Sequence, residues 1–297
     1  MTEQKTIAVL LRLASDPRPP ARMATEGARI RSRGIRHIPN PADLSALEEA
    51  LALAAPLKAT VTVFGFGDSR VDDLLRLGLS LGAHRAVRLG GEGVARGDAA
   101  ANARLLSRAL LIMDPTIFIT GDRMVDRGDD PAPALAAALR DLPSVSRVLD
   151  VSFKSDTVEV LRKSDRGGRQ RVSAPLPCAL LVAGEAREVG YPPLEAVIAS
   201  LEAKVEVWGL PELGLPEHAI GKAGSYLEAG RFITPRPDPI RVVTPDATLP
   251  AFERIISLLS GGIAAREGKT HFGSADDAVN GLMRVFASAG LLPEGTS

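Results

Sequence analysis

The segment GDRMVDRGDDP, residues 121–131, places six charged side chains within a short stretch. Four are carboxylates and two are guanidinium groups: Asp122, Asp126, Asp129, Asp130, Arg123 and Arg127. The segment follows an apolar, strand-like run and precedes an Ala-rich helical pattern. Aspartates at a helix start are stabilised by the helix dipole, which favours a self-contained, salt-bridged cap. The alternative is a ligand loop in which arginines and backbone N–H groups hold a phosphate. The segment alone leaves both interpretations open.

A second candidate is GFGDS, residues 65–69, which places Gly65 and Gly67 between a strand pattern and a helix pattern. Close backbone approach at a helix start is how proteins hold phosphates. The next glycine is Gly78, so no complete G-x-G-x-x-G motif is present. A tight strand-to-helix turn is therefore the simpler interpretation, with a phosphate loop as the alternative.

Other familiar chemistries find little support. The four histidines lie far apart, at no metal-ligand or triad spacing: His37, His84, His218 and His271. The single cysteine, Cys178, lies in the apolar run LPCALLVAG and is expected to be an inert core residue. One cysteine excludes an internal disulfide framework and a cysteine-cluster metal site. We therefore predict no catalytic group, no metal and no enzymatic activity.

Composition sets the class of protein. The chain has 297 residues, Lys+Arg 36 against Asp+Glu 36, and 45% hydrophobic residues. These values are typical of a globular protein, and balanced charge predicts no nucleic-acid partner. No apolar stretch reaches the roughly 18 residues of a membrane span, which predicts no membrane insertion. The N-terminus shows no signal-peptide pattern, and the single cysteine fits a reducing compartment, so a cytoplasmic location is expected.

Strand and helix patterns alternate along the first half of the chain. Apolar strand-like runs are expected at 6–13, 59–66, 84–90 and 116–121, and helices at 41–55, 68–82, 98–113 and 131–142. This alternation predicts an α/β fold with a doubly wound, mainly parallel, Rossmann-like sheet. Val-rich alternating runs at 145–176 predict an added antiparallel β segment, and 177–184 one more buried strand. Ligands of such sheets bind beyond the carboxyl ends of the strands. That rule selects the loops 12–20, 65–69 and 121–131, with Asn40 at a helix start beside them.

The C-terminal part loses this rhythm. Pro-rich connectors separate two amphipathic helix patterns, at 252–259 and 275–291. We predict a nucleotide-binding-like α/β domain at 1–209 and, at 210–297, an extended Pro-rich arm that packs on a partner subunit; packing back onto the domain is the alternative. The loop YPPL carries Tyr191 and Leu194. Leu194 either tucks into its own domain or anchors in a partner pocket.

Four stretches together resemble the beta subunit of electron transfer flavoproteins, over residues 6 to about 208. NPADLSALEEALAL is similar to the family's N-P-F-x-E-x-A-x-E-E-A segment, and LLRLGLSLGAHRAVRL to its T-x-R-x-A-L-A-M-G-A-D-R stretch. The segment beginning at Gly121 lies where the family has G-x-x-x-x-D-D-D-x-N-Q-T-G. PCALLVAG followed by YPPLEAVIASLEAK resembles the family's P-A-V-V-x-V and P-R-Y-x-x-L-P-x-I-x-x-A-x-K stretches.

The resemblance implies a heterodimer whose alpha subunit holds most of the redox-active FAD, and a flavin-dependent dehydrogenase as redox partner. It implies that the beta subunit binds an AMP with no redox role. The positions that the resemblance assigns to this cofactor site are Val9, Asn40, Pro41, Ala42, Asp43, Phe66, Gly121, Asp122, Arg123, Met124, Val125, Asp126, Asp129 and Asp130. It assigns Tyr191 and Leu194 to the loop that docks dehydrogenases, and the arm to a segment that embraces the alpha subunit.

The sequence departs from the family pattern at the phosphate loop. Where the family has D-D-x-N-Q-T, this chain has RGDDPA, residues 127–132, so the amide and hydroxyl ligands are missing. An empty site, another adenine nucleotide and a site filled by side chains all stay open. Two other functions also stay open. One is a stand-alone adenine-nucleotide-binding regulator of the same fold. The other is an ATP-dependent carboxylate-activating enzyme, although it would need an S-G-G-x-D loop that is absent.

Overall fold

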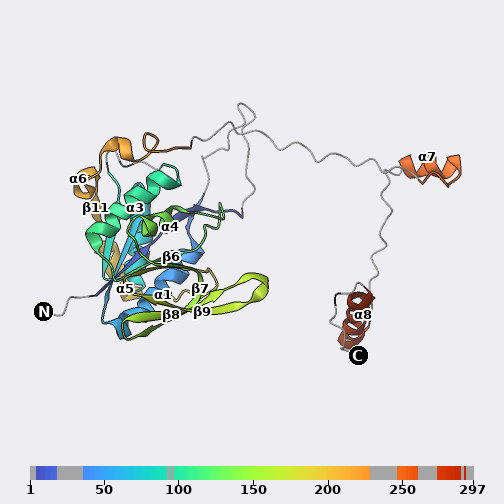
Figure 1. Cartoon of the computed structure of the whole chain (residues 1–297), viewed down its shortest axis with the longest axis horizontal. Coiled ribbons are helices and arrows are strands. Elements are labelled where there is room, and N and C mark those ends of the chain that lie inside the picture. Colours follow the sequence, from blue (N-terminus) through green and yellow to red (C-terminus); the bar gives the residue numbers. More distant parts are fainter. Residues whose placement is uncertain are drawn as a thin grey trace. The chain divides into compact units, whose positions relative to one another are not determined.

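The computed structural model describes residues 5–18, 36–91, 94, 97–227, 246–259, 273–288 and 291. The chain divides into two compact units, residues 1–234 and residues 235–297. The first unit contains all the strands of the described chain and the candidate functional site (Figure 1). A Pro- and Arg-rich stretch at 16–36, whose composition favours a long loop or hairpin, lies mostly outside the described residues.

A nine-stranded sheet with the order β11-β5-β4-β1-β6-β10-β7-β8-β9 forms the first unit. Its strands are β1 (Thr6–Leu10), β4 (Thr60–Phe66), β5 (Arg85–Leu89), β6 (Ile117–Gly121), β7 (Ser144–Lys154), β8 (Thr157–Lys163), β9 (Arg169–Pro175), β10 (Cys178–Val182) and β11 (Glu206–Trp208). The seven strands from β11 to β7 run parallel, whereas β8 and β9 are antiparallel additions. The predicted fold class, a mainly parallel α/β sheet with an antiparallel segment, is confirmed.

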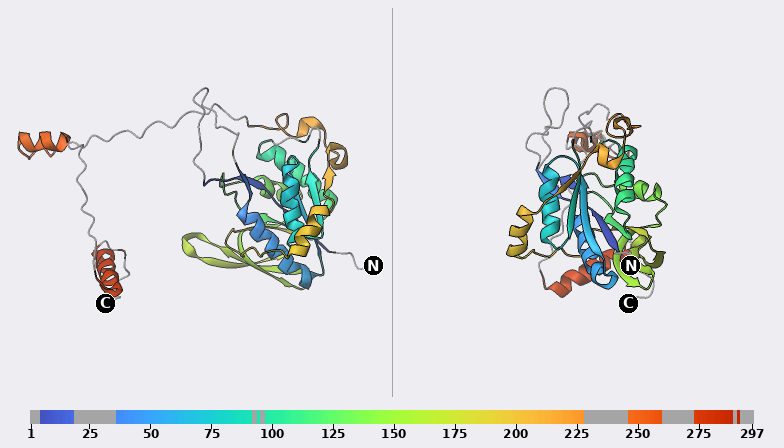
Figure 2. Two further views of the ribbon diagram at one scale, coloured as in Figure 1. Left: turned by 180° about the vertical axis from the view of Figure 1, so that it is seen from behind. Right: turned by 90° about the vertical axis from the view of Figure 1, so that its left-hand side faces the viewer.

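Helices cover both faces of the sheet (Figure 2). On one face, α1 (Pro41–Leu57) and α2 (Arg70–Ser80) pack over alternate strand residues such as Ile7 and Val9. On the other, α3 (Ala99–Met113), α4 (Ala132–Ala138) and α6 (Leu210–Leu213) pack over the intervening ones, such as Ala8 and Leu10. Because successive strand side chains point to opposite faces, a strand buried on both sides must be apolar throughout. This is the physical reason for the continuous apolar runs in the sequence.

Several element boundaries differ from those that the sequence predicts; helix α4, for example, ends at Ala138 and not at 142. The first apolar run ends as a strand at Leu10, and Leu13–Ser15 forms β2, which pairs antiparallel with β3 (His37–Pro39). Helix α1 continues past Pro56 to Leu57, and the chain then turns at Lys58 with a φ of 51°. A proline in the last turn removes only one hydrogen bond, so the packing of Leu57 in the core outweighs that loss.

The segment from Leu210 to Leu227 belongs to the first unit and packs against α3, although the sequence places it in the arm. Leu213 and Ile220 are buried in the same core layer as α3. Arg108 Nε donates to the carbonyl of Leu213 at 2.9 Å, and Arg104 Nη1 to the carbonyl of Gly224 at 2.7 Å. These contacts with one helix face hold the segment in place.

The second unit contains two described helices, α7 (Ala251–Leu259) and α8 (Ala275–Ser288). Both leave large apolar side chains exposed to solvent, among them Phe252, Ile255, Leu259, Leu282 and Phe286. No helix in the described part of the chain has the length and apolar character that crossing a membrane requires.

Candidate functional site

The candidate site lies at the carboxyl ends of β1 and β6, which are neighbours in the sheet. From β1 the chain proceeds to β4 on one side, and it later crosses to β6 on the other. Such a change of direction opens a crevice at the end of the sheet, where doubly wound proteins bind ligands. Three segments meet here: the chain after β1, the first turn of α1, and the loop after β6.

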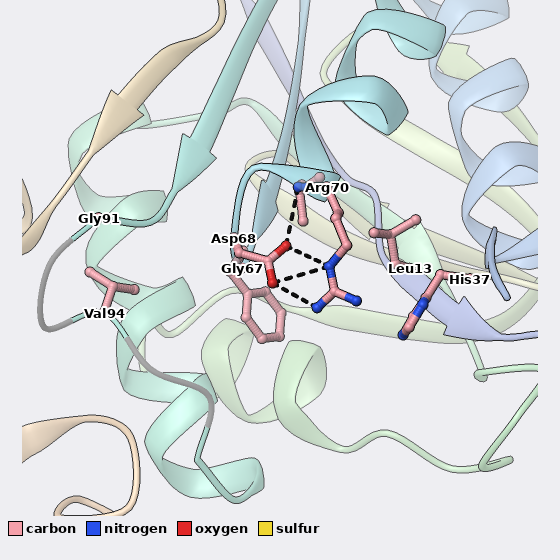
Figure 3. A pocket seen from close by; sticks show the side chains of 9 residues that line it. Leu13, His37, Gly67, Asp68, Arg70, Gly91 and Val94 are labelled. Atoms are coloured by element: carbon pink, nitrogen blue, oxygen red, sulfur yellow. Dashed lines mark hydrogen bonds and ion pairs between the residues drawn. The ribbon is translucent and has the colours of Figure 1, made fainter. Parts of the chain in front are cut away.

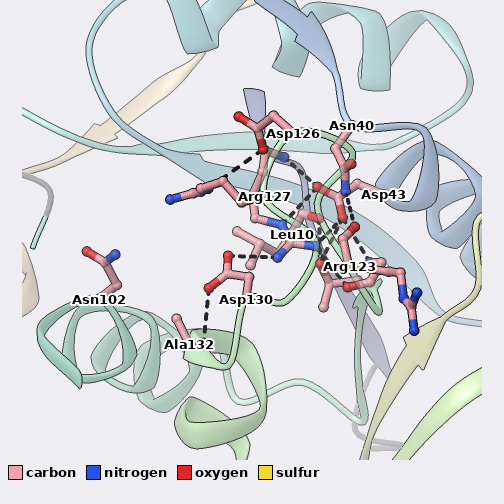
Figure 4. Close-up of polar contacts among 12 residues, drawn as sticks. Leu10, Asn40, Asp43, Asn102, Arg123, Asp126, Arg127, Asp130 and Ala132 are labelled. Atoms are coloured by element: carbon pink, nitrogen blue, oxygen red, sulfur yellow. Dashed lines mark hydrogen bonds and ion pairs between the residues drawn. The ribbon is translucent and has the colours of Figure 1, made fainter. Parts of the chain in front are cut away.

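The carboxylate of Asp43, in the first turn of α1, joins these segments (Figure 4). Its Oδ1 accepts hydrogen bonds from Arg12 Nη2 at 2.6 Å, from the Gly121 amide at 2.9 Å and from Thr120 Oγ1 at 3.3 Å. Its Oδ2 accepts from the Arg12 amide at 2.8 Å and from Arg12 Nε at 3.0 Å. One carboxylate thus fastens the ends of β1 and β6 to the start of α1.

Arg12 is a buried cation, with 1% of its side chain exposed. Beyond Asp43, its Nη1 donates to Asp130 Oδ2 at 2.9 Å and its Nη2 to the carbonyl of Gly121 at 2.8 Å. Burial by itself lowers the pKa of Arg12, but the adjacent charges and hydrogen bonds of Asp43 and Asp130 outweigh it and raise the pKa above its usual value. The guanidinium therefore stays charged and fully engaged within the fold.

Asn40 holds the loop after β6 with its side-chain amide. Its Nδ2 donates to the carbonyl of Arg123 at 2.9 Å, and its Oδ1 accepts from the Val125 amide at 3.1 Å. Asn40 occupies the N-cap position of α1, as predicted, but its side chain makes no capping hydrogen bond. The loop itself closes through paired backbone hydrogen bonds between Met124 and Gly128, of 2.7 and 2.8 Å.

Gly121 permits the close approach on which this arrangement depends. A Cβ atom at this position would lie 2.6 Å from Ala42 Cβ and 2.6 Å from Asp43 Oδ1. Any larger residue would therefore push β6 away from the first turn of α1.

The predicted pairing of the loop carboxylates with Arg123 and Arg127 is weak. Arg123 Nε lies 3.9 Å from Asp122, Arg127 Nε lies 3.7 Å from Asp126, and both guanidinium groups are largely exposed. Asp126 Oδ2 accepts from the Ser15 amide at 2.9 Å. One oxygen of Asp122 and one of Asp126 are buried without a hydrogen-bond partner in the structure.

Burial of Asp122 disfavours the charged form of its carboxyl group and raises its pKa. The charges of Arg123 and Lys163 oppose this shift without cancelling it.

The predicted cofactor positions fall into three sets. Asn40, Pro41, Ala42, Asp43 and the loop from Gly121 to Asp130 lie together around the network of Arg12. Val9 lies in the middle of β1 and is fully buried in the core. Phe66 lines a separate pocket of about 330 Å³ at the end of β4 (Figure 3).

That pocket is formed by the ends of β4 and β5 together with β2 and β3; its lining residues are Leu13, His37, Phe66, Gly67, Asp68, Arg70, Val71, Gly91 and Val94. Asp68 pairs with Arg70 Nη2 at 2.6 Å and also accepts from the Arg70 amide at 3.1 Å. The Asp68 carboxylate therefore already accepts a hydrogen bond from the Arg70 amide, a donor at the start of α2 that a bound phosphate would need.

The strand-end rule selects the loop 12–20, which begins at Arg12, but the sequence assigns neither Arg12 nor Thr120 a role in the site. Arg12 lies near the end of the apolar run at 6–13 and resembles an ordinary charged residue at a strand end. Its partners Asp43, Gly121 and Asp130 are between 31 and 118 positions away in the chain. The available signal was topological: Arg12 and Thr120 lie at the carboxyl ends of strands that a doubly wound order makes neighbours.

A second cluster of predicted residues lies on α5 (Leu194–Glu202) and the loop before it. Tyr191 is 99% exposed and Leu194 is 72% exposed. Ile198 and Leu201, one and two turns further along α5, are also exposed. The interpretation of Leu194 as a residue tucked into its own domain is therefore wrong. The spacing places Leu194, Ile198 and Leu201 on one helix face as an apolar stripe.

Helix α1 also holds the base of this loop. Ser45 Oγ accepts from the Arg187 amide at 2.9 Å, and Glu48 Oε1 accepts from the Gly190 amide at 2.9 Å. Glu49, fully buried, pairs with Arg187 Nε and accepts from the Val151 amide at 2.9 Å. Burial raises the pKa of Glu49, and its hydrogen bond and charge interaction with Arg187 oppose the shift. The exposed tip therefore stands on a base fixed by hydrogen bonds.

Metal and thiol chemistry are not indicated in the described part of the chain, which contains no cluster of histidine, cysteine and carboxylate ligands able to hold a metal ion. Cys178 is buried in β10, and burial raises the pKa of its thiol to about 12. It is the inert core residue that the sequence predicts.

Comparison with known proteins decides the family. The family model described as the electron transfer flavoprotein domain matches residues 29–213, more than half of the chain. The chain belongs to the electron transfer flavoprotein beta family. It is 32% identical to the protein FixA of Rhizobium meliloti (strain 1021) over 216 residues, covering 69% of this chain and 73% of that protein.

Other relatives agree. The chain is 30% identical to the electron transfer flavoprotein subunit beta of Mycobacterium tuberculosis (strain ATCC 25618 / H37Rv), covering 65% of this chain and 74% of that protein. It is 30% identical to FixA of Azotobacter vinelandii, covering 70% and 76%. Membership of this family places the chain in flavoprotein electron transport.

The residues of this electron transfer flavoprotein chain do not fit the phosphate of an AMP. The amides of Gly121, Val125 and Ala132 already donate to side chains of the protein itself. Asp126 and Asp130 face the same region with carboxylates, and a phosphate beside them would meet like charge. We derive no role for AMP from this site.

Proposed function

We propose that the chain is the beta subunit of a heterodimeric electron transfer flavoprotein. An alpha subunit holds most of the FAD, and the flavin supplies the redox chemistry when it is bound. This chain supports that flavin and docks a flavin-dependent dehydrogenase, and it catalyses no reaction of its own. We place the complex in the cytoplasm. The observation that carries the proposal is the family match over residues 29–213, on a chain whose docking helix α5 leaves its apolar stripe exposed.

The chain's own contribution is positional. Electron transfer between two flavins requires that the donor and acceptor be held at a fixed separation and orientation. The network of Arg12 and Asp43 makes the carboxyl end of the sheet rigid, and α1 fixes the base of the docking loop. Tyr191 and Leu194 then present an aromatic and an aliphatic anchor of the kind that dominates many protein interfaces.

The part of the predicted arm that contains α7 and α8 also has a role in this proposal. Helices α7 and α8 each expose apolar side chains in the second unit, including Phe252 and Phe286. Exposed apolar surface of this kind marks interaction sites. We propose that this part of the chain packs on the alpha subunit.

Co-expression with an electron transfer flavoprotein alpha subunit tests the proposal. We expect a stable yellow complex with the two chains in equal amounts and about one FAD, the ratio of a specific heterodimer. A chain that stays monodisperse alone and recruits neither subunit nor flavin would overturn the proposal. That result would favour the stand-alone nucleotide-binding regulator, an alternative that the occupied amides of the loop do not support.

Truncation tests the arm. Removing residues 228–297 keeps the segment that Arg104 and Arg108 hold on α3, so the shortened chain is expected to fold. We expect it to lose the alpha subunit during gel filtration, whereas the full chain retains it. Stoichiometric co-elution of the shortened chain would refute the role of the arm.

A further inference from the structure

Asp130 accepts two hydrogen bonds, one of them from the buried cation Arg12. Its Oδ2 accepts from Arg12 Nη1 at 2.9 Å, and its Oδ1 accepts from the amide of Ala132, the first residue of α4, at 3.2 Å. The contact with Arg12 is the one that resembles anion binding, because guanidinium groups are donors that proteins direct at phosphates, whereas the contact with Ala132 spans only two residues. The Asp130 carboxylate is 12% exposed, so it is largely withdrawn from solvent at this position.

We propose that the Asp130 carboxylate is a built-in anion that takes the place of a nucleotide phosphate, so that this subunit folds and works with no AMP. The inference rests on the proposed function, because AMP is expected here only of an electron transfer flavoprotein beta subunit. In this proposal the loop from Gly121 to Ala132 is a structural element that covers the end of the sheet, and it does not bind a nucleotide.

The charges around the loop support this assignment. Arg12 is the buried cation of the network, and Asp43 and Asp130 already neutralise it on two sides. Arg123 and Arg127 point their guanidinium groups to solvent. A phosphate would therefore add negative charge next to Asp126 and Asp130 with no unpaired buried cation to receive it.

Three backbone donors around the loop are occupied as well. Asn40 accepts a hydrogen bond from the amide of Val125, Asp43 accepts one from Gly121, and Asp130 accepts one from Ala132. Binding a phosphate at any of these three amides would require an internal hydrogen bond to break, leaving its acceptor unpaired. These donors are therefore already used within the protein.

The nucleotide content of the co-expressed heterodimer is the direct test. We expect the heat-denatured complex to release about one FAD and less than about a tenth of an AMP per heterodimer, with the AMP measured by chromatography. Release of AMP in amounts comparable to FAD would overturn the inference. The proposed function fails differently, through loss of the complex or its flavin, so the two failures are distinguishable.

Two single variants test the role of the carboxylate. Asp130→Ala leaves Arg12 Nη1 and the Ala132 amide without their partner, whereas Asp129→Ala removes an equal charge from the neighbouring exposed position. We expect about 10 mM inorganic phosphate to raise the melting temperature of the Asp130→Ala heterodimer by several degrees and to leave the Asp129→Ala and parent heterodimers unchanged.

Equal responses of the three proteins would show that the carboxylate does not occupy an anion position. If the Asp130→Ala heterodimer does not assemble, soaking crystals of the parent complex with AMP gives the same decision. Electron density for a nucleotide at Arg12 and Ala132 would overturn the inference, and unchanged contacts of Asp130 would support it.

Discussion

Replacing Asp43 with alanine should be the most destabilising single change at the crevice. The substitution removes five hydrogen bonds, from Arg12 N, Nε and Nη2, the Gly121 amide and Thr120 Oγ1. Both side chains of the pair are 1% exposed, so the variant leaves the Arg12 charge buried with only Asp130 and the Gly121 carbonyl. Breaking a buried ion pair from one side costs about 3–5 kcal/mol. A domain has roughly 5–15 kcal/mol of stability to lose.

Urea denaturation of the co-expressed complex, followed by far-UV circular dichroism, measures this loss as a lower midpoint with an unchanged slope. Asp73→Ala is the matched control, because Asp73 is 91% exposed and lies 3.6 Å from Arg76. An exposed pair of this kind is worth at most about 1 kcal/mol. The double variant Arg12→Met with Asp43→Leu should recover most of the stability, since it removes both charges together.

A loss below about 1 kcal/mol for Asp43→Ala, equal to that of Asp73→Ala, would refute the reasoning. It would mean that the ends of β1 and β6 are held by strand packing alone. A double variant that is no more stable than Asp43→Ala would show instead that the network acts through its shape and not through the charge of Arg12.

Three further predictions follow from exposure and burial. Leu194→Ala should slow reduction by the dehydrogenase about 30-fold at low concentration, as expected for an anchor worth about 2 kcal/mol, with FAD content unchanged. Leu139→Ala, at an exposed position after α4, is the control, and equal rates would remove the anchor assignment. Asp122→Asn should stabilise the protein at pH 7, seen as a higher urea midpoint, because burial disfavours the charged carboxylate and raises the pKa of Asp122. The native carboxyl gives up stability as the pH rises from 3.8 through its raised pKa, so the gain should vanish below pH 3.8; a pH-independent gain would contradict this. The Cys178 thiol should resist iodoacetamide in the native protein and react fully in urea, and native labelling by mass spectrometry would show that β10 opens.

The sequence predicts the sheet well because burial on both faces leaves a strong local signal. Runs such as CALLV in β10 and, after its first residue Thr6, TIAVL in β1 are apolar throughout, and the helices between them have regular apolar spacing. The sequence predicts the edges less well. β11 reads as an extended tail after α5, and its parallel pairing with β5 depends on partners more than a hundred residues away.

The site was predicted only in outline for the same reason. The strand-end rule selects the loops after β1 and β6, but it says nothing about which side chain turns inward. Arg12 turns inward because Asp43 and Asp130 are both there to pair with it, at separations of 31 and 118 residues. A charged residue has no local pattern that distinguishes a buried, paired position from an exposed one, so its burial could not be predicted before the topology was known.

Helix α1 connects the crevice and the docking loop. Asp43 fastens its first turn to β6, and Ser45 and Glu48, within the next turn and a half, fasten the base of the loop that ends at Leu194. Because these residues lie on one continuous helix whose packing is part of the core, the two attachments cannot shift independently without bending it. A docking anchor is useful for electron transfer only if its base does not move, since the flavins must be held at a fixed separation. The arrangement therefore favours a rigid base with a freely exposed tip, and changes at Asp43 and at Glu48 are expected to affect docking through the same helix.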